Sequence, residues 1–202
     1  MGFRTLLAVP LLAPSTLAQA GGTVTVVGVV QPVGGPTICM QGETHYLECT
    51  QVFLKSSVVN LGSYAGQTVR VSGVDVGVTC HVIEVAQASP AGVRLSWSGS
   101  PTPGGTVTFM TCVYLPNPPH PYWLFFSAGA GYFPIDPSFG TVLLASPFFF
   151  LGSGFAAICG NLAVAIPPDP GLLGATFWEE AFTPVLPFLG PPLSNATCLT
   201  IL

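Results

Sequence analysis

Residues 23–27 read Thr23-Val24-Thr25-Val26-Val27, a run in which polar and apolar side chains alternate. Alternation with a period of two is typical of a strand that buries one face and exposes the other. Similar runs recur between Gly- and Pro-rich segments, whereas helix signals are nearly absent, so the chain is predicted to be all-β. The further predicted strands are Thr44–Lys55, Thr68–Ser72, Cys80–Val85, Val93–Trp97, Thr106–Met110, Tyr122–Phe126, Thr141–Ala145, Ala156–Ile166, Thr176–Phe182 and Ala196–Leu202.

The strands fall into two groups that meet near residue 90. Ala86–Gly92 (AQASPAG) consists mostly of small residues and indicates a linker. The sequence therefore predicts two modules, residues 21–88 and 91–202, each of small-domain size. The regular spacing of strands in the second module is typical of a β-sandwich.

The first twenty residues have the layout of a secretory signal peptide. Arg4 provides a basic start, Leu6–Leu12 is a short apolar stretch, and Ala18-Gln19-Ala20 is a small-residue cleavage pattern. We therefore expect cleavage after Ala20 and export to the extracellular space, the cell surface or the periplasm.

Charged residues make up only 6% of the chain. Beyond residue 20, the basic side chains are Lys55, Arg70 and Arg94. Nucleic-acid binding requires clusters of Lys and Arg that neutralise phosphates, so no nucleic-acid partner is expected. A chain with so little charge is expected to expose apolar patches, which usually mark partner surfaces.

The chain carries six cysteines, an even number that predicts disulfides in an exported protein. They contain no CxxC pair, so zinc-finger and thioredoxin-like functions have no support. Three cysteines fall in each predicted module, and complete pairing would therefore place at least one bridge between modules. Cys39–Cys49 is one candidate pair, around a turn at Gln41-Gly42. The six positions are Cys39, Cys49, Cys80, Cys112, Cys159 and Cys198.

The segment Thr141–Ile158 has no charged residue and is long enough to raise the possibility of a transmembrane helix. Pro147, Gly152 and Gly154 interrupt it. These residues favour two buried strands around a turn, so no transmembrane anchor is expected.

Two parts of the chain resemble known modules. Residues 61–73 (LGSYAGQTVRVSG) resemble the "L..Y.G..V.V.G" stretch of small bacterial OB-fold barrels. Residues 166–177 (IPPDPGLLGATF), followed by Leu193-Ser194-Asn195-Ala196, resemble the end of a recurrent, uncharacterised C-terminal module of secreted bacterial proteins. These resemblances imply an OB-like barrel over residues 21–88 and an immunoglobulin-like sandwich over residues 91–202, and they imply no catalytic residue.

The titratable side chains do not form a recognisable catalytic or metal-binding motif. Glu43 and His45 share a face of an extended chain, but they flank a predicted solvated turn. His81 and Glu84 are three apart on a strand and face opposite sides, as do the adjacent Glu179 and Glu180. A further carboxylate, Asp169, lies between prolines and is expected to cap a turn. No catalytic residue, metal ligand or cofactor is therefore predicted.

The segment Pro116–Phe139 is the best candidate for recognition because it concentrates aromatic residues near Gly and Pro turns. Aromatic faces at loop edges can bind sugars or another protein. The alternative is that alternate aromatics of Tyr122–Phe126 fill the core. The candidate recognition residues are Tyr122, Trp123, Tyr132 and Phe133.

The sequence favours an exported, non-catalytic structural, adhesion or binding protein. The expected partner is a neutral glycan or another extracellular protein. The alternative is a hydrolase of extracellular polymers whose carboxylates converge only in the folded chain.

Overall fold

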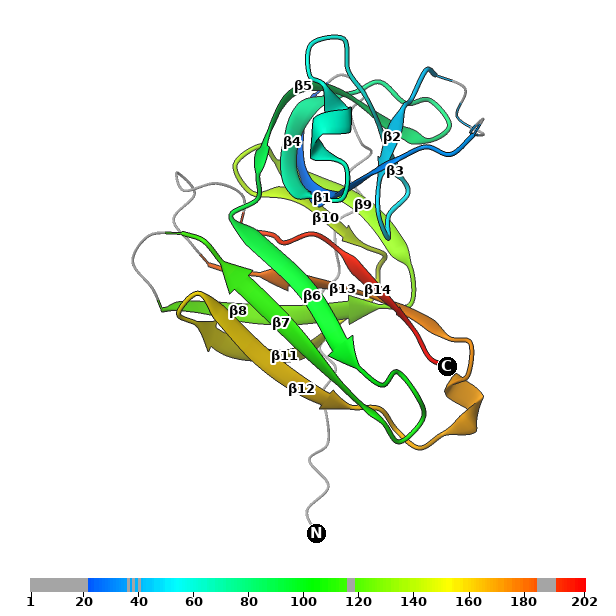
Figure 1. Ribbon diagram of the computed structural model, residues 1–202, viewed down its shortest axis with the longest axis vertical. Coiled ribbons are helices and arrows are strands. Elements are labelled where there is room, and N and C mark those ends of the chain that lie inside the picture. Colours follow the sequence, from blue (N-terminus) through cyan, green and yellow to red (C-terminus); the bar gives the residue numbers. More distant parts are fainter. Residues whose placement is uncertain (1–21, 36, 38, 40, 116–118, 185–191) are drawn as a thin grey trace.

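A computed structural model describes residues 22–35, 37, 39, 41–115, 119–184 and 192–202 (Figure 1). The predicted signal peptide, residues 1–20, lies outside the described residues. Within these residues nearly all regular structure is β-strand, and two short 3₁₀-helices occur, η1 (Leu61–Tyr64) and η2 (Pro170–Leu172). The all-β prediction is confirmed.

The first half of the chain forms a closed barrel with strand order β1-β2-β3-β5-β4. β3 runs parallel to β5, and the other neighbours are antiparallel. At Gly73, β4 passes so close to the backbone of Glu84 that a Cβ would collide with it. This arrangement is the predicted OB-like barrel. Its strands are β1 (Thr23–Pro32), β2 (His45–Leu47), β3 (Val52–Lys55), β4 (Thr68–Asp75) and β5 (His81–Pro90).

The second half forms an immunoglobulin-like sandwich, as predicted, with a three-stranded sheet β12-β7-β6 and a four-stranded sheet β11-β8-β13-β14. Leu95 and Phe109 from the first sheet share a buried core with Leu124 and Leu199 from the second. The strands are β6 (Val93–Gly99), β7 (Thr106–Val113), β8 (His120–Ser127), β11 (Phe148–Ala156), β12 (Cys159–Ala165), β13 (Thr176–Phe182) and β14 (Thr197–Thr200).

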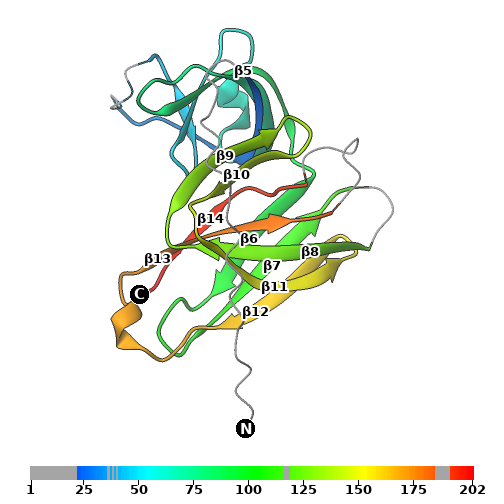
Figure 2. The ribbon, with the colours of Figure 1, turned by 180° about the vertical axis from the view of Figure 1, so that it is seen from behind.

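A hairpin of β9 (Ala130–Asp136) and β10 (Gly140–Leu144) lies between barrel and sandwich (Figures 1 and 2). It is inserted between β8 and β11 of the four-stranded sheet. Thr141 Oγ1 donates a hydrogen bond of 2.9 Å to the carbonyl oxygen of Thr25 on β1. Leu143 is fully buried in the barrel core. The hairpin therefore joins the two halves through shared packing.

The prediction of one strand over Thr44–Lys55 is wrong, because the chain reverses between β2 and β3. Cys49 has a positive φ of 58°, in the left-handed region that permits a tight turn. The hydroxyl of Thr50 donates to the carbonyl oxygen of Leu47 at 2.6 Å and stabilises this reversal.

The predicted linker Ala86–Gly92 is mostly strand. β5 continues to Pro90 because its backbone pairs with β4 along its whole second half. Only Ala91 and Gly92 separate β5 from β6. Barrel and sandwich are thus directly connected.

The segment Thr141–Ile158 forms strands, as predicted, and contains β10 and β11. The prediction that both strands are buried is wrong, because β11 is largely exposed or half-buried, and the partner strand β9 was missed. The predicted strand Ala156–Ile166 begins too early, since Ala156 ends β11 and Cys159 begins β12. None of the helices in the described part of the chain has the length and hydropathy needed to cross a membrane.

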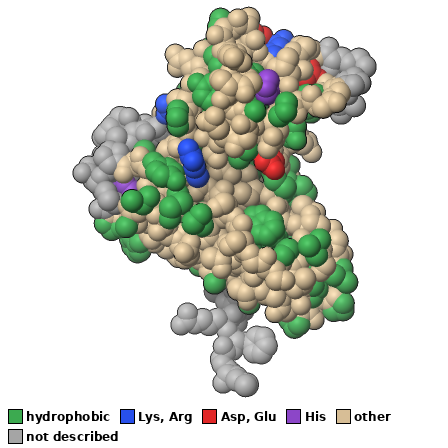
Figure 3. Space-filling view, viewed as in Figure 1, with side chains coloured by type: hydrophobic (Ala, Val, Ile, Leu, Met, Phe, Trp, Pro, Cys, Tyr) green, Lys and Arg blue, Asp and Glu red, His purple; other side chains and the backbone are tan. Residues whose placement is uncertain are grey.

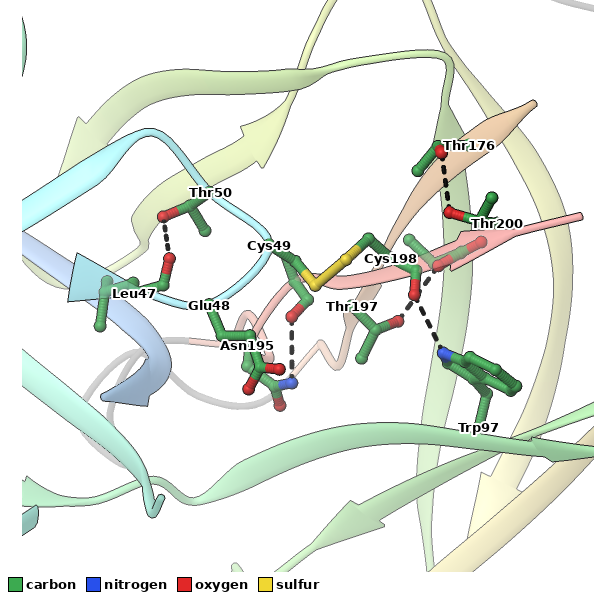
Figure 4. The surroundings of a disulfide bond; sticks show 12 residues. Leu47, Glu48, Cys49, Thr50, Trp97, Thr176, Asn195, Thr197, Cys198 and Thr200 are labelled. Atoms are coloured by element: carbon green, nitrogen blue, oxygen red, sulfur yellow. Dashed lines mark hydrogen bonds between the residues drawn. A yellow bond between two sulfur atoms is a disulfide. The ribbon is translucent and has the colours of Figure 1, made fainter. Parts of the chain in front are cut away.

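All six cysteines form disulfides, as Cys39–Cys80, Cys49–Cys198 and Cys112–Cys159. The candidate pair Cys39–Cys49 is wrong, because the turn at Cys49 faces the C-terminal strand β14 (Figure 4). Beside that bridge, the indole nitrogen of Trp97 donates to the carbonyl oxygen of Cys198 at 3.1 Å. As the cysteine distribution requires, one bridge joins barrel and sandwich.

Candidate functional site

Aromatic side chains gather on the outer face of the four-stranded sheet, which is the face turned away from the sandwich core. Phe150 and Glu180 lie directly opposite Phe125, and Phe182 lies opposite Trp123. Opposite residues in paired strands share a face of the sheet, and alternate residues of one strand do too. We call this set, together with Phe139 from the β9–β10 hairpin, the aromatic face. Its members are Trp123, Phe125, Phe139, Phe148, Phe150 and Phe182.

The rings of the aromatic face contact one another in two groups. Phe182 stacks with Trp123 and with Phe139, with ring centroids 5.5 and 5.9 Å apart. Phe125 makes edge-to-face contacts with Phe148 and Phe150 at 6.0 and 5.8 Å. Such geometry stabilises aromatic pairs beyond the burial of their area, so the rings hold one another in fixed orientations.

Part of the aromatic face remains accessible to solvent. Phe150 exposes 48% of its surface and Phe139 exposes 38%, and the neighbouring Ile135 exposes 56%. Phe155, which follows on the same strand as Phe150, exposes 71%. Large exposed apolar patches are uncommon on monomeric proteins and often mark interaction surfaces or ligand-binding grooves.

A cavity of about 170 Å³ opens between the aromatic face and the hairpin. Val142 and Leu144 of β10 line it on one side, and Phe125 and Phe182 line it on the other. Its remaining wall is apolar except for Glu180. The cavity therefore suits an apolar group.

Glu180 lies buried in the wall of this cavity, with only 2% of its surface exposed. Its Oε2 accepts a hydrogen bond of 2.9 Å from the backbone nitrogen of Leu143, whereas Oε1 is buried without a partner among the described residues. Burial raises the pKa of Glu180 to about 8, although the bond from Leu143 opposes the shift. At neutral pH the carboxyl group is mostly protonated, and it fixes the hairpin against β13.

Glu179 points to the other side of β13, as predicted from its adjacent position. It borders an apolar groove of about 440 Å³ between the two sheets. Its Oε2 accepts a hydrogen bond of 3.1 Å from Thr197 Oγ1. Burial raises the pKa of Glu179 to about 8 as well, with the Thr197 bond opposing the shift. The two carboxyl groups face different cavities and cannot act on one substrate.

The structure places the four candidate recognition residues in different surroundings. Tyr122 is 1% exposed and belongs to a core cluster with Val93 and Val113, so no external ligand can stack on it. Trp123 is half-buried on the aromatic face. Tyr132 stacks on His81 at the junction of hairpin and barrel, with centroids 3.8 Å apart. Phe133 is half-buried on β9.

The other titratable candidates bond to close neighbours. Glu43 accepts from the backbone nitrogen of Gln41 at 2.8 Å, while His45 Nδ1 and Thr44 Oγ1 are 2.9 Å apart. Glu84 forms an ion pair with Lys55 at 3.5 Å. Burial lowers the pKa of His45. Glu43 and His45 are thus held by local contacts.

Two further carboxylates also have local partners. Asp75 Oδ2 lies 3.0 Å from His81 Nδ1. Asp169 accepts from the backbone nitrogen of Gly171 at 2.8 Å, which confirms its predicted role as a turn cap. Within the residues that the structure describes, no three His, Cys, Asp or Glu side chains converge to hold a metal ion.

The distribution of charge distinguishes the two halves. Figure 3 shows Lys, Arg, Asp and Glu side chains over the barrel and its junction with the sandwich, and hydrophobic side chains over the lower sandwich. Between residues 95 and 168 the only charged side chain is Asp136. The sandwich surface therefore carries few charges, and hydrophobic side chains are exposed on part of it.

Comparison of the chain with protein-family models, curated proteins and solved structures found no match. The resemblance of residues 91–202 to a recurrent bacterial module remains a prediction.

Sequence reasoning noticed the aromatic segment but did not identify most of the site. Phe148, Phe150 and Phe182 lie outside that segment, on strands that pair with β8 only in the folded chain. A usable signal was the triplet Phe148-Phe149-Phe150, since three successive aromatics on a strand must place at least one outside the core.

Proposed function

We propose that this chain is an exported, non-catalytic protein that binds another extracellular protein through the aromatic face, in an adhesive or structural role. The observation that carries the proposal is the fixed, partly exposed set of aromatic rings beside an apolar cavity. Three disulfides support export, because such bridges persist mainly in oxidising compartments. The signal-peptide pattern over residues 1–20 agrees.

The chemistry of the face favours a protein over a neutral glycan. Sugar recognition combines a free aromatic face with nearby hydrogen-bonding side chains that orient the hydroxyl groups. Here the Phe182 ring already stacks with both Trp123 and Phe139. The polar side chain closest to the cavity, Glu180, is buried. An apolar side chain of a partner protein fits these surroundings better.

The hydrolase alternative receives less support. A glycosidase needs two carboxyl groups that flank one bond, about 5–9.5 Å apart and on facing walls of a cleft. Glu179 and Glu180 occupy opposite sides of one strand. The other carboxylates discussed above accept local hydrogen bonds or form ion pairs.

The proposal is tested by retention of the purified, disulfide-bonded protein on cell-surface material and on a panel of neutral polysaccharides. We expect retention on the protein-containing material and a loss of at least tenfold for the double variant F139S/F150S, since hot-spot aromatics each contribute about 2 kcal/mol or more. Protease treatment of the surface material should abolish retention.

The matched control is the double variant V78S/I158S. Val78 and Ile158 are 89% and 63% exposed and lie outside the aromatic face, so their loss removes a similar amount of exposed apolar surface. Equal weakening by both double variants would contradict the proposal, because it would indicate nonspecific apolar adhesion. Retention on polysaccharides that survives protease treatment would instead favour a glycan ligand.

A further inference from the structure

A polar groove of about 520 Å³ lies on the outside of the barrel, on elements different from those of the aromatic face. Such a volume falls within the roughly 300–1,000 Å³ range of small-molecule sites. Strands β4 and β5 form its floor, and the segment around η1 forms a wall. The lining side chains that can form hydrogen bonds are Asn60, Ser63, Tyr64, Arg70, Ser72, Gln87 and Ser89.

The floor of the groove is a cross-strand set of polar side chains. Arg70 on β4 lies directly opposite Ser89 on β5, and Ser72 lies opposite Gln87. Val69 and Val71 alternate with these residues on β4 and are buried in the barrel core. Because side chains alternate along a strand, the buried valines hold Arg70 and Ser72 on the outer face.

Several groups in the groove have unused hydrogen-bonding capacity. The side chains of Asn60, Arg70, Gln87 and Ser89 make no hydrogen bond to any residue that the structure describes, although Ser72 Oγ contacts Thr25 Oγ1 at 3.0 Å. The guanidinium of Arg70 presents five N–H donors, and amides and hydroxyls can both donate and accept. The groove therefore matches a ligand that is rich in hydroxyl groups.

The positive charge of Arg70 further restricts the kinds of ligand that the groove can bind. Elsewhere on the barrel, Lys55 is paired with Glu84 at 3.5 Å and His81 with Asp75 at 3.0 Å. Arg70 has no carboxylate within 4.0 Å among residues 22–35, 37, 39, 41–115, 119–184 and 192–202. An unpaired guanidinium in a groove of neutral polar groups is complementary to a planar carboxylate, which it binds in a bidentate manner.

We propose that this groove binds a sugar that carries a carboxylate, with Arg70 holding the carboxylate and Gln87 and Ser89 contacting the hydroxyl groups. Asn60, on the wall formed by the η1 segment, supplies a further amide to the ligand. This site is separate from the aromatic face and does not depend on the proposed function.

The test is isothermal titration of the disulfide-bonded protein with digalacturonate, with its neutral counterpart galactobiose, and with inorganic sulfate. We expect digalacturonate to bind at millimolar or lower concentration and galactobiose at least tenfold more weakly. R70Q should weaken digalacturonate binding at least tenfold, because it removes a charge-assisted bidentate contact. The second variant Q87A should weaken binding without changing the net charge.

The matched control is K55Q, which also removes one positive charge from the barrel but from a residue already paired with Glu84. It should leave digalacturonate binding within about twofold of the original, because Lys55 does not line the groove. Circular dichroism confirms that each variant is folded.

Three results would overturn the proposal. The first is the absence of binding by digalacturonate to the folded protein at millimolar concentration. The second is equal weakening by R70Q and K55Q, which would indicate a general effect of charge. The third is sulfate binding as tight as that of digalacturonate, which would indicate an anion site without sugar recognition.

Discussion

Glu179 and Glu180 are adjacent in the sequence, and both carboxyl groups are buried. Each is 2% exposed, and each has one hydrogen bond to its carboxyl group, from Thr197 and from Leu143. A buried carboxylate with a single bond is poorly compensated for the water that it has lost, so the neutral acid is favoured. Each of the two carboxyl groups therefore carries a proton in the folded protein at neutral pH.

This arrangement predicts that stability falls as the pH rises. The pKa of each carboxyl group increases from its ordinary value of 4.5 to about 8 on folding. The stabilisation is fully present below pH 4.5 and is lost as the pH approaches 8, because the folded state binds more protons in that range. Each group contributes a slope of at most about 1.4 kcal/mol per pH unit. Urea unfolding at a series of pH values measures it.

The variant E180Q isolates one of the two groups. A glutamine keeps an acceptor for the Leu143 nitrogen and cannot ionise, so about half of the slope should disappear and stability at pH 8 should increase. A slope identical to that of the original protein would show that Glu180 ionises in the folded state without cost.

Tyr122 provides a second prediction at the scale of one residue. Its hydroxyl is buried without a partner among the described residues, and Gly154 lies against it. Removing an unpaired buried hydroxyl should cost nothing, so Y122F is expected to be as stable as the original or more stable by about 1 kcal/mol. A loss of more than 1 kcal/mol in urea unfolding would reveal a hydrogen bond that the hydroxyl makes.

At the scale of elements, the β9–β10 hairpin couples the two halves of the molecule. It belongs to the second half of the chain by sequence, but it packs on the first half. Tyr132 of β9 stacks on His81 of the barrel, and Leu143 of β10 enters the barrel core. Glu180 holds the other side of β10. We therefore expect barrel and sandwich to unfold together.

The variant L143A tests this coupling. Truncation of a fully buried leucine typically costs about 2–5 kcal/mol. All three tryptophans, Trp97, Trp123 and Trp178, lie in the sandwich, so their fluorescence reports on that half alone. A barrel-core truncation should nevertheless shift the fluorescence and circular dichroism transitions by the same amount. A shift in circular dichroism without one in fluorescence would contradict the coupling.

The hairpin also shows why sequence reasoning succeeded for some elements and failed for others. Alternation predicted β1 and β4 as strands, and β4 does bury one face in the barrel. The prediction that β1 exposes its other face is wrong, because Thr25 and Val27 are also buried and the hairpin residue Thr141 contacts Thr25. β9 (AGYFPID) has no such alternation, since it is an edge strand that pairs only with β10 and tolerates Pro134. The turn at Cys49 depends on the positive φ of that residue, which the sequence does not predict.

The sequence alone could not predict which side chains form the aromatic face, because it does not show which alternate set of β8 side chains points to the core. Alternation along β8 predicted that one set of its aromatics would be buried and the other exposed. Which set faces the core depends on the sheet that covers it, and this placed Tyr122 inside and Trp123 outside. Phe182 joined the face through strand pairing between residues far apart in the chain.

At the scale of the whole molecule, the bridge Cys49–Cys198 joins the barrel to the last strand of the sandwich. It closes a loop with a sequence separation of 149 residues. The double variant C49S/C198S should lower the free energy of unfolding by about 2–5 kcal/mol and leave the other two bridges intact. Urea unfolding and peptide mapping without reduction check these outcomes, and detection of a Cys39–Cys49 peptide in the original protein would contradict the assignment.

Site-specific photo-crosslinking can test whether the aromatic face contacts a partner protein, as we propose. A photoreactive residue at Ser153, opposite Trp123 on the aromatic face, is compared with one at Asn161, an exposed position on the other sheet. On cell-surface material, we expect a protein adduct from position 153 and none from position 161. Adducts of equal yield from both positions, or from position 161 alone, would contradict it.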